Sequence, residues 1–214
     1  MPLVTGEGND TGIDSIAIIV NNNIVTDVGA IEDLLAVNGY LDVTFVFVQA
    51  ERAPHFDSAK IGTFGFGVRD FFGEGKLPCN DTIQQYADIM SAIYENSSKF
   101  RPNRPSCYLY YVTTGTWNSD PPLVVRAETE LSDLRRTQLF EKVEFIPIGA
   151  DQINKLYQQS KNAITREFVS FWPVVQYRHD HSQIRSLRYS QAQRPYRSSI
   201  FFTTSRCISG STCV

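Results

Sequence analysis

The chain has few of the residues that build disulfide scaffolds, zinc sites or hydrolase triads. Its 214 residues include four cysteines, at positions 79, 107, 207 and 213, and no CxxC pair. This spacing excludes a zinc ribbon and argues against a small disulfide-stabilised fold. Of three histidines, only His55 lies outside the motif His179-Asp180-His181, which has no distant third ligand. A metal site at that motif and a Ser/His/Asp or Cys/His triad are therefore not expected.

Long apolar runs are also missing. No run reaches the roughly 18 residues that a membrane-spanning helix requires, and the N-terminus has neither the basic nor the apolar region of a secretion signal. Hydrophobic residues nevertheless make up 42% of the chain and aromatic residues 12%, enough to bury a substantial core. We therefore expect a globular cytoplasmic protein without membrane contact.

Positive charge is scarce in most of the chain and concentrated at its end. Residues 171–214 contain six arginines, no lysine and one acid, a net charge of +5, so the overall charge of −3 leaves −8 for residues 1–170. The C-terminal part is also rich in serine and has neither helical nor strand periodicity. We therefore divide the chain into an α/β domain of residues 1–168 and a divergent basic tail of residues 169–214.

Strand and helix patterns alternate along the first of these parts. A hairpin is expected where Ser15–Val20 and Ile24–Thr26 flank three asparagines, which tolerate the left-handed backbone of a tight turn. The apolar run at 43–48 is typical of a central strand covered on both faces. Further strands are expected at 106–113 and 143–148, and helices at 30–37, 56–75, 81–94, 126–142 and 151–163, with Asp27 and Asp81 as caps. This order predicts an α/β fold with a mixed central sheet flanked by helices.

Two glycine-rich stretches look like nucleotide-binding loops but fail the requirements for one. GTFGFG at 62–67 has the wrong spacing, and the glycines at 6, 8 and 12 precede a strand. A phosphate-binding loop instead follows a strand and opens a helix. Nucleotide binding of that type is therefore not expected.

The strongest candidate site joins the start of one predicted strand to the end of another. Asp14 stands where the first strand begins, and Gln49 and Glu51 end the long apolar strand. Side chains alternate along a strand, so Gln49 and Glu51 share one face, and all three residues converge if the strands are neighbours. Two carboxylates about 4 Å apart repel by about 4 kcal/mol at an effective dielectric constant near 20, and a divalent cation removes that repulsion. The alternative is that Asp14 is a turn residue and that Gln49 and Glu51 mark the exit of the strand into solvent.

Several segments carry a resemblance to known nucleases. GNDTGIDSIAIIV followed by FVFVQAER resembles the nuclease core of the PD-(D/E)xK superfamily, in its Mrr-like version where glutamine replaces an acid. More narrowly, four segments resemble the N-terminal region of the abortive-infection phage-resistance (AIPR) family. They are VNNNIVTDVGAIEDLL, GYLDVTFVFVQAE, FDSAKIGTFGFGVRDFF and VEFIPIGADQINKLYQQSKNAITREF. The likeness covers residues 8–168. It implies a restriction-endonuclease-like fold and a Mg²⁺- or Mn²⁺-dependent nuclease that acts on DNA or RNA in phage defence.

The resemblance also implies roles for individual residues. Asp14 falls on the metal-binding aspartate of the family, and Glu51 falls where a lysine usually steadies the attacking water, two positions after Gln49. Glu51 then binds the metal itself, or Lys60 on the following helix supplies the cation, or activity is lost and the chain is a nucleic-acid-binding or regulatory remnant. The likeness stops after Phe168. One explanation of the tail is a shifted reading frame in a truncated gene product, and the other is a basic arm that contacts phosphates.

Overall fold

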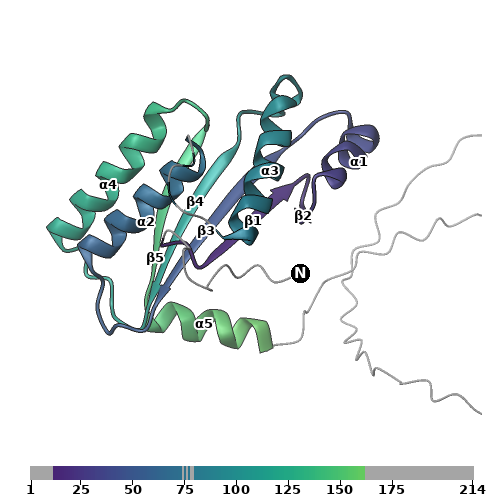
Figure 1. Cartoon of the computed structure of the whole chain (residues 1–214). Coiled ribbons are helices and arrows are strands. Elements are labelled where there is room, and N and C mark those ends of the chain that lie inside the picture. The colour runs from purple at the N-terminus through teal and green to yellow at the C-terminus, as the bar shows by residue number, and fades with distance from the viewer. Residues whose placement is uncertain (1–11, 74, 76, 78–79, 162–214) are drawn as a thin grey trace, which may run out of the picture. The chain divides into compact units, whose positions relative to one another are not determined.

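The computed structural model describes residues 12–73, 75, 77 and 80–161 (Figure 1). The predictions for the tail of residues 169–214, for its histidines and arginines, for the domain boundary at 168 and for Cys79 lie outside the described residues. The strands are β1 (Ser15–Val20), β2 (Asn23–Val25), β3 (Val43–Glu51), β4 (Ser106–Thr113) and β5 (Lys142–Ile148). The helices are α1 (Gly29–Asn38), α2 (Ser58–Phe71), α3 (Asp81–Glu95), the short 3₁₀ helix η1 (Ser97–Lys99), α4 (Pro121–Arg136) and α5 (Ala150–Lys161).

The strands form one mixed sheet in the order β2-β1-β3-β4-β5. Strand β1 is antiparallel to β2 and to β3, whereas β3, β4 and β5 run parallel to one another. The predicted hairpin is confirmed, because Asn21 and Asn22 adopt left-handed φ angles of 51° and 64° between β1 and β2. The α/β class and the mixed sheet expected from the sequence are therefore present.

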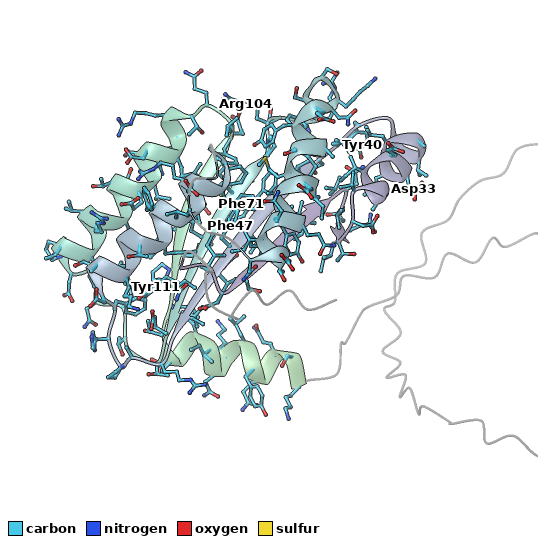
Figure 2. The ribbon with its side chains drawn as sticks, viewed as in Figure 1. Asp33, Tyr40, Phe47, Phe71, Arg104 and Tyr111 are labelled. Carbon is cyan, nitrogen blue, oxygen red and sulfur yellow. The ribbon has the colours of Figure 1, made fainter. Side chains whose placement is uncertain are left out.

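One face of the sheet carries the core. Alternate residues of β1, β3 and β4 are buried on this face, where the apolar stripes of α1 to α4 pack against them. Figure 2 labels Phe47 of β3 and Phe71 of α2, whose ring centroids lie 5.3 Å apart between sheet and helix. On the opposite face the described side chains of β3, such as Val46 and Val48, are half-buried. The expectation that β3 is covered on both faces therefore holds for one face and is wrong for the other, because within the described chain α1 to α4 pack on one face only.

Helices α2 and α4 depart from their predicted bounds, and α2 covers Ser58–Phe71 instead of residues 56–75. Helix α4 begins at Pro121 instead of residue 126 and ends at Arg136 instead of residue 142. Two prolines open it, which suits the first turn, where backbone N–H groups have no helical partner. After Arg136 the chain turns through a left-handed Gln138, with φ 57°, and the backbone N–H of Glu141 donates to Pro105 as β5 approaches β4.

The caps of the other helices decide where those helices start. Asp27 caps α1 as predicted, since its carboxylate accepts from the backbone N–H of Ala30 at 3.0 Å. For α3 the cap is Asn80 and not Asp81, because the Asn80 side chain accepts from the N–H of Ile83 at 3.0 Å. Asp81 is the first helical residue, where a negative charge favours the positive end of the helix dipole.

Candidate active site

Asp14 lies against the last residues of β3. Its backbone N–H donates to the carbonyl of Val48 at 2.9 Å, and its Oδ2 accepts from the N–H of Ala50 at 2.6 Å. Ser15 pairs with Val48 in the antiparallel register, so Asp14 is at the next position, opposite Gln49. Residues at paired positions of an antiparallel sheet share a face. The predicted neighbourhood of the two strands is therefore confirmed, and Asp14 comes to the same end of β3 as Gln49 and Glu51.

Gln49 and Glu51 are joined to each other on that face. The Gln49 amide nitrogen, Nε2, donates to Glu51 Oε1 at 3.3 Å. The amide oxygen of Gln49 is buried and accepts no hydrogen bond. An amide oxygen shielded from solvent without a donor costs about 1–3 kcal/mol, so the position favours a proton donor or a cation that completes it.

Lys60 reaches Glu51 from helix α2. Its Nζ lies 3.2 Å from Glu51 Oε1, and its side chain is 60% exposed whereas that of Glu51 is 23% exposed. Asp57 fixes the start of α2, because its carboxylate accepts from the N–H groups of Ala59 at 2.7 Å and of Lys60 at 3.1 Å. The first turn of α2 therefore places the Lys60 ammonium group beside the end of β3.

Tyr111 lines the same place from β4. It pairs with Gln49 in the parallel β3–β4 register and is fully buried, and its hydroxyl has no hydrogen-bond partner. Burial raises the pKa of the Tyr111 phenol, and the negative charges of Glu51 and Asp57 raise it further. The phenol therefore keeps its proton and remains a hydrogen-bond donor at this end of the sheet.

Sequence reasoning did not identify Tyr111 as a site residue. Alternation along 106–113 places it on the buried face with residues 107 and 109, but only the order of the strands sets it beside Gln49. Lys60 was a candidate through the resemblance alone. Its contact with Glu51 depends on the packing angle of α2, which no local pattern in the sequence records.

The donor set of this site fits a hard divalent cation. Mg²⁺ accepts one or two carboxylates with neutral oxygen ligands and water, and the site offers Asp14, Glu51 and the unpartnered Gln49 oxygen. Within the described ranges no group of three or more His, Cys, Asp or Glu side chains is placed to hold a metal ion. A cation here would therefore depend on the Gln49 amide oxygen and on water in addition to the two carboxylates.

Comparisons of the chain with protein-family models, with curated proteins and with solved structures find no match. Among the helices that the structure describes, none has the length and apolarity needed to cross a membrane.

Proposed function

We propose that this chain is a metal-dependent phosphodiesterase that cleaves nucleic acid, a nuclease with a restriction-endonuclease-like core acting in phage defence. The observation that carries the proposal is the Gln49 amide oxygen, which is buried without a donor at the end of β3 where Asp14 and Glu51 also lie. The resemblance of residues 8–168 to nucleases of the AIPR family is the reason for proposing hydrolysis of phosphodiester bonds at this site.

Asp14, Gln49 and Glu51 are the residues that would hold a Mg²⁺ or Mn²⁺ ion. Such an ion lowers the pKa of a bound water and offsets negative charge that develops on phosphorus. Lys60 brings the positive charge that the usual motif lysine would bring, because it approaches the Glu51 carboxylate from α2. In this role Lys60 leaves Glu51 for a phosphate oxygen or a water, and the Tyr111 hydroxyl, which keeps its proton, donates a hydrogen bond to the Gln49 oxygen or to a water next to it.

The test is cleavage by the purified chain of plasmid, single-stranded DNA and RNA, with and without Mg²⁺. We expect Mg²⁺-dependent cleavage that Asp14→Ala abolishes and that Lys60→Met lowers by about 10²-fold or more, the scale of losing one electrostatic donor. Asp33→Ala and Lys99→Met, at exposed residues of α1 and η1, are the matched controls and retain activity. Cleavage that survives Asp14→Ala at the unmodified rate would overturn the assignment.

A second candidate function is nucleic-acid binding without cleavage. The observation that favours it is the engagement of Glu51 Oε1 by both Gln49 and Lys60, so that the site neutralises its own charge. If the unmodified chain binds but does not cleave, and Glu51→Lys restores Mg²⁺-dependent cleavage, this second function holds.

A further inference from the structure

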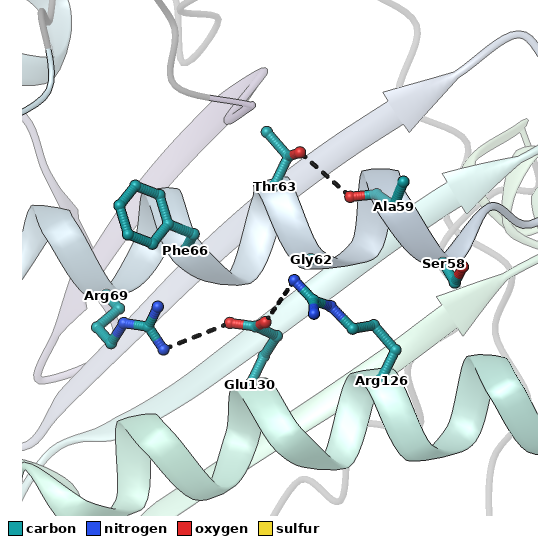
Figure 3. A pocket seen from close by; sticks show the side chains of 8 residues that line it. All are labelled: Ser58, Ala59, Gly62, Thr63, Phe66, Arg69, Arg126 and Glu130. Carbon is teal, nitrogen blue, oxygen red and sulfur yellow. Dashed lines mark hydrogen bonds and ion pairs between the residues drawn. The ribbon is translucent and has the colours of Figure 1, made fainter.

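A groove runs along helix α2 on the side that faces α4. It is open to solvent, has a volume of about 500 Å³ and follows α2 from Ser58 in the first turn to Arg69 in the last, with Arg126 and Glu130 of α4 opposite (Figure 3). The stretch of α2 from Ser58 to Arg69 rises about 16 Å, which is roughly the axial rise of five nucleotides in one strand of a DNA duplex. We call this feature the α2–α4 groove.

Two guanidinium groups meet at a single buried carboxylate in this groove. Arg126 Nη2 lies 3.0 Å from Glu130 Oε1, and Arg69 Nη1 lies 3.6 Å from Glu130 Oε2. The Glu130 side chain is 6% exposed, whereas Arg126 is 44% exposed and Arg69 is 32% exposed. Arg126 is therefore oriented by Glu130, whereas Arg69 donates to Asp133 and lies within the field of the Glu130 charge. Both arginines turn part of their planar, donor-rich surface toward solvent.

The floor of the groove is built from glycine. A Cβ added at Gly62 would lie 1.9 Å from Arg126 Nη2, so the guanidinium rests directly on the α2 backbone. Any larger residue at 62 would push Arg126 out of its place over the groove. The stretch GTFGFG, which fails as a nucleotide-binding loop by its spacing, thus serves the close approach of an arginine to a helix.

The charge of the groove differs from that of the surrounding protein. Residues 1–170 carry a net charge of −8. Around the groove, however, three arginines (Arg69, Arg126 and Arg136) share two carboxylates, those of Glu130 and Asp133. This leaves one net positive charge beside a hollow that also offers the Ser58 and Thr63 side chains.

The groove begins in the helical turn that contacts the candidate active site. Ser58 and Ala59 line its end, and the next residue, Lys60, is the cation at Glu51. Lys60 itself does not line the groove, because two residues along an α-helix turn its side chain by about 200° from that of Ser58. A nucleic-acid strand that contacts both places would therefore pass over the first turn of α2.

We propose that the α2–α4 groove binds a backbone phosphate of the same nucleic-acid strand that occupies the site at Glu51 and Lys60. The identity of the ligand as nucleic acid rests on the proposed function, whereas the preference for a phosphate rests on the groove itself. Arg126 and Arg69 donate to the phosphate oxygens, and Glu130 and Asp133 hold the two guanidiniums in place without contacting the ligand.

Binding in the presence of a chelator tests the groove separately from cleavage. The fluorescence anisotropy of a short 5′-labelled single strand, DNA or RNA, is followed at rising salt for the full chain. We expect Arg126→Gln and Arg69→Gln each to weaken binding about 5- to 10-fold and to lower the slope of log K against log salt by about 0.7. Arg104→Gln is the matched control, because Arg104 is 52% exposed and pairs with one glutamate, Glu141, away from the groove. It leaves affinity and slope unchanged.

A further variant and a further ligand test the groove even if the arginine variants do not fold. Thr63 is exposed in the groove, so Thr63→Glu introduces a negative charge without disturbing Glu130 and is expected to weaken binding even if the arginine variants unfold. Inorganic phosphate separates the two sources of a phosphate ligand: a rise in Tm with phosphate but no binding of either oligonucleotide would assign the groove to a free anion and overturn the proposal. Equal affinities for Thr63→Glu, Arg126→Gln and the Arg104→Gln control would overturn it as well.

The outcomes also separate this proposal from the proposed function. Arginine-dependent binding without any Mg²⁺-dependent cleavage leaves the groove in place and removes the nuclease assignment. Cleavage that depends on Asp14 but not on Arg69 or Arg126 supports the nuclease assignment and overturns the role of the groove.

Discussion

Replacing Gly65 by alanine tests how closely α2 and α4 approach. An ideal Cβ at Gly65 would lie 2.5 Å from both Cβ and Cγ of Glu130, closer than such atoms come in folded proteins. The Glu130 Cβ is attached directly to the α4 backbone, so it cannot rotate away. The helices themselves must separate, and the ion pairs that Glu130 makes with Arg69 and Arg126 must lengthen.

The magnitude follows from two opposing contributions. Alanine is favoured over glycine inside a helix by about 1 kcal/mol, and overpacking a close interface costs about 1–3 kcal/mol, to which the disturbed buried ion pairs add. We expect Gly65→Ala to lower the free energy of unfolding by about 1–2 kcal/mol. For a domain of this size that corresponds to a decrease in Tm of about 2–8 °C.

Gly62→Ala is the matched control in the same helix. Its Cβ would meet only the guanidinium of Arg126, the far end of a flexible side chain that is 44% exposed and can turn into solvent. Glu130 then keeps Arg69 as its remaining nearby cation, and the gain in helix propensity of about 1 kcal/mol offsets much of the weakened pairing, so we expect Gly62→Ala to be less destabilised than Gly65→Ala. Thermal and urea unfolding followed by circular dichroism measures both variants. A Gly65→Ala protein as stable as the Gly62→Ala protein would refute the close packing on which the groove depends.

Three further predictions concern single side chains. Asp14→Ala should be less stable than Asp14→Asn by about 1 kcal/mol in urea unfolding, because only asparagine keeps an acceptor for the Ala50 N–H; equal midpoints would show that this hydrogen bond does not hold the end of β3. Burial raises the pKa of Glu130, so its contribution to stability is present at acid pH and lost as the pH rises through the folded-state pKa. Glu130→Gln should therefore gain stability relative to the unmodified chain between acid and neutral pH, and a difference that does not change with pH would contradict this. Cys107 is fully buried and burial raises the pKa of its thiol, so mass spectrometry of its peptide should find it alkylated in urea but not in the native protein; rapid native alkylation would place it at the surface.

The parts of the fold that local patterns record were predictable from the sequence. The hairpin at Asn21 and Asn22, the long strand β3 and the strand at 106–113 each follow from residue types within the segment itself. The start of α4 was missed because two prolines at 121 and 122 read as a loop when the helix behind them is polar and weakly patterned. Prolines in the first turn of a helix look the same in sequence as prolines in a loop, and only the following hydrogen bonds distinguish them.

The site was predictable in part for the same reason. Alternation placed Gln49 and Glu51 on one face, but the contact of Asp14 with Ala50 depends on pairing between strands that lie 36 residues apart. The glycines of α2 show the limit more sharply. Their spacing has no local meaning, because the partners that require them, Arg126 and Glu130, are on a helix more than sixty residues further along.

On the proposed function, the balance of free energies at β3 favours an occupied site. The Lys60–Glu51 pair has a lysine that is 60% exposed, and an ion pair of this kind contributes about 0–1 kcal/mol, so releasing Lys60 costs little. The buried Gln49 oxygen without a donor costs about 1–3 kcal/mol, which any species that completes its coordination recovers. The contact between Lys60 and Glu51 is therefore too weak to keep ligands out. On this proposal the contact keeps the Lys60 ammonium near the site until a phosphate takes the place of Glu51 or a metal ion takes the place of Lys60. Glu51 in the position of the usual lysine is then compatible with an active site, because Lys60 supplies the positive charge.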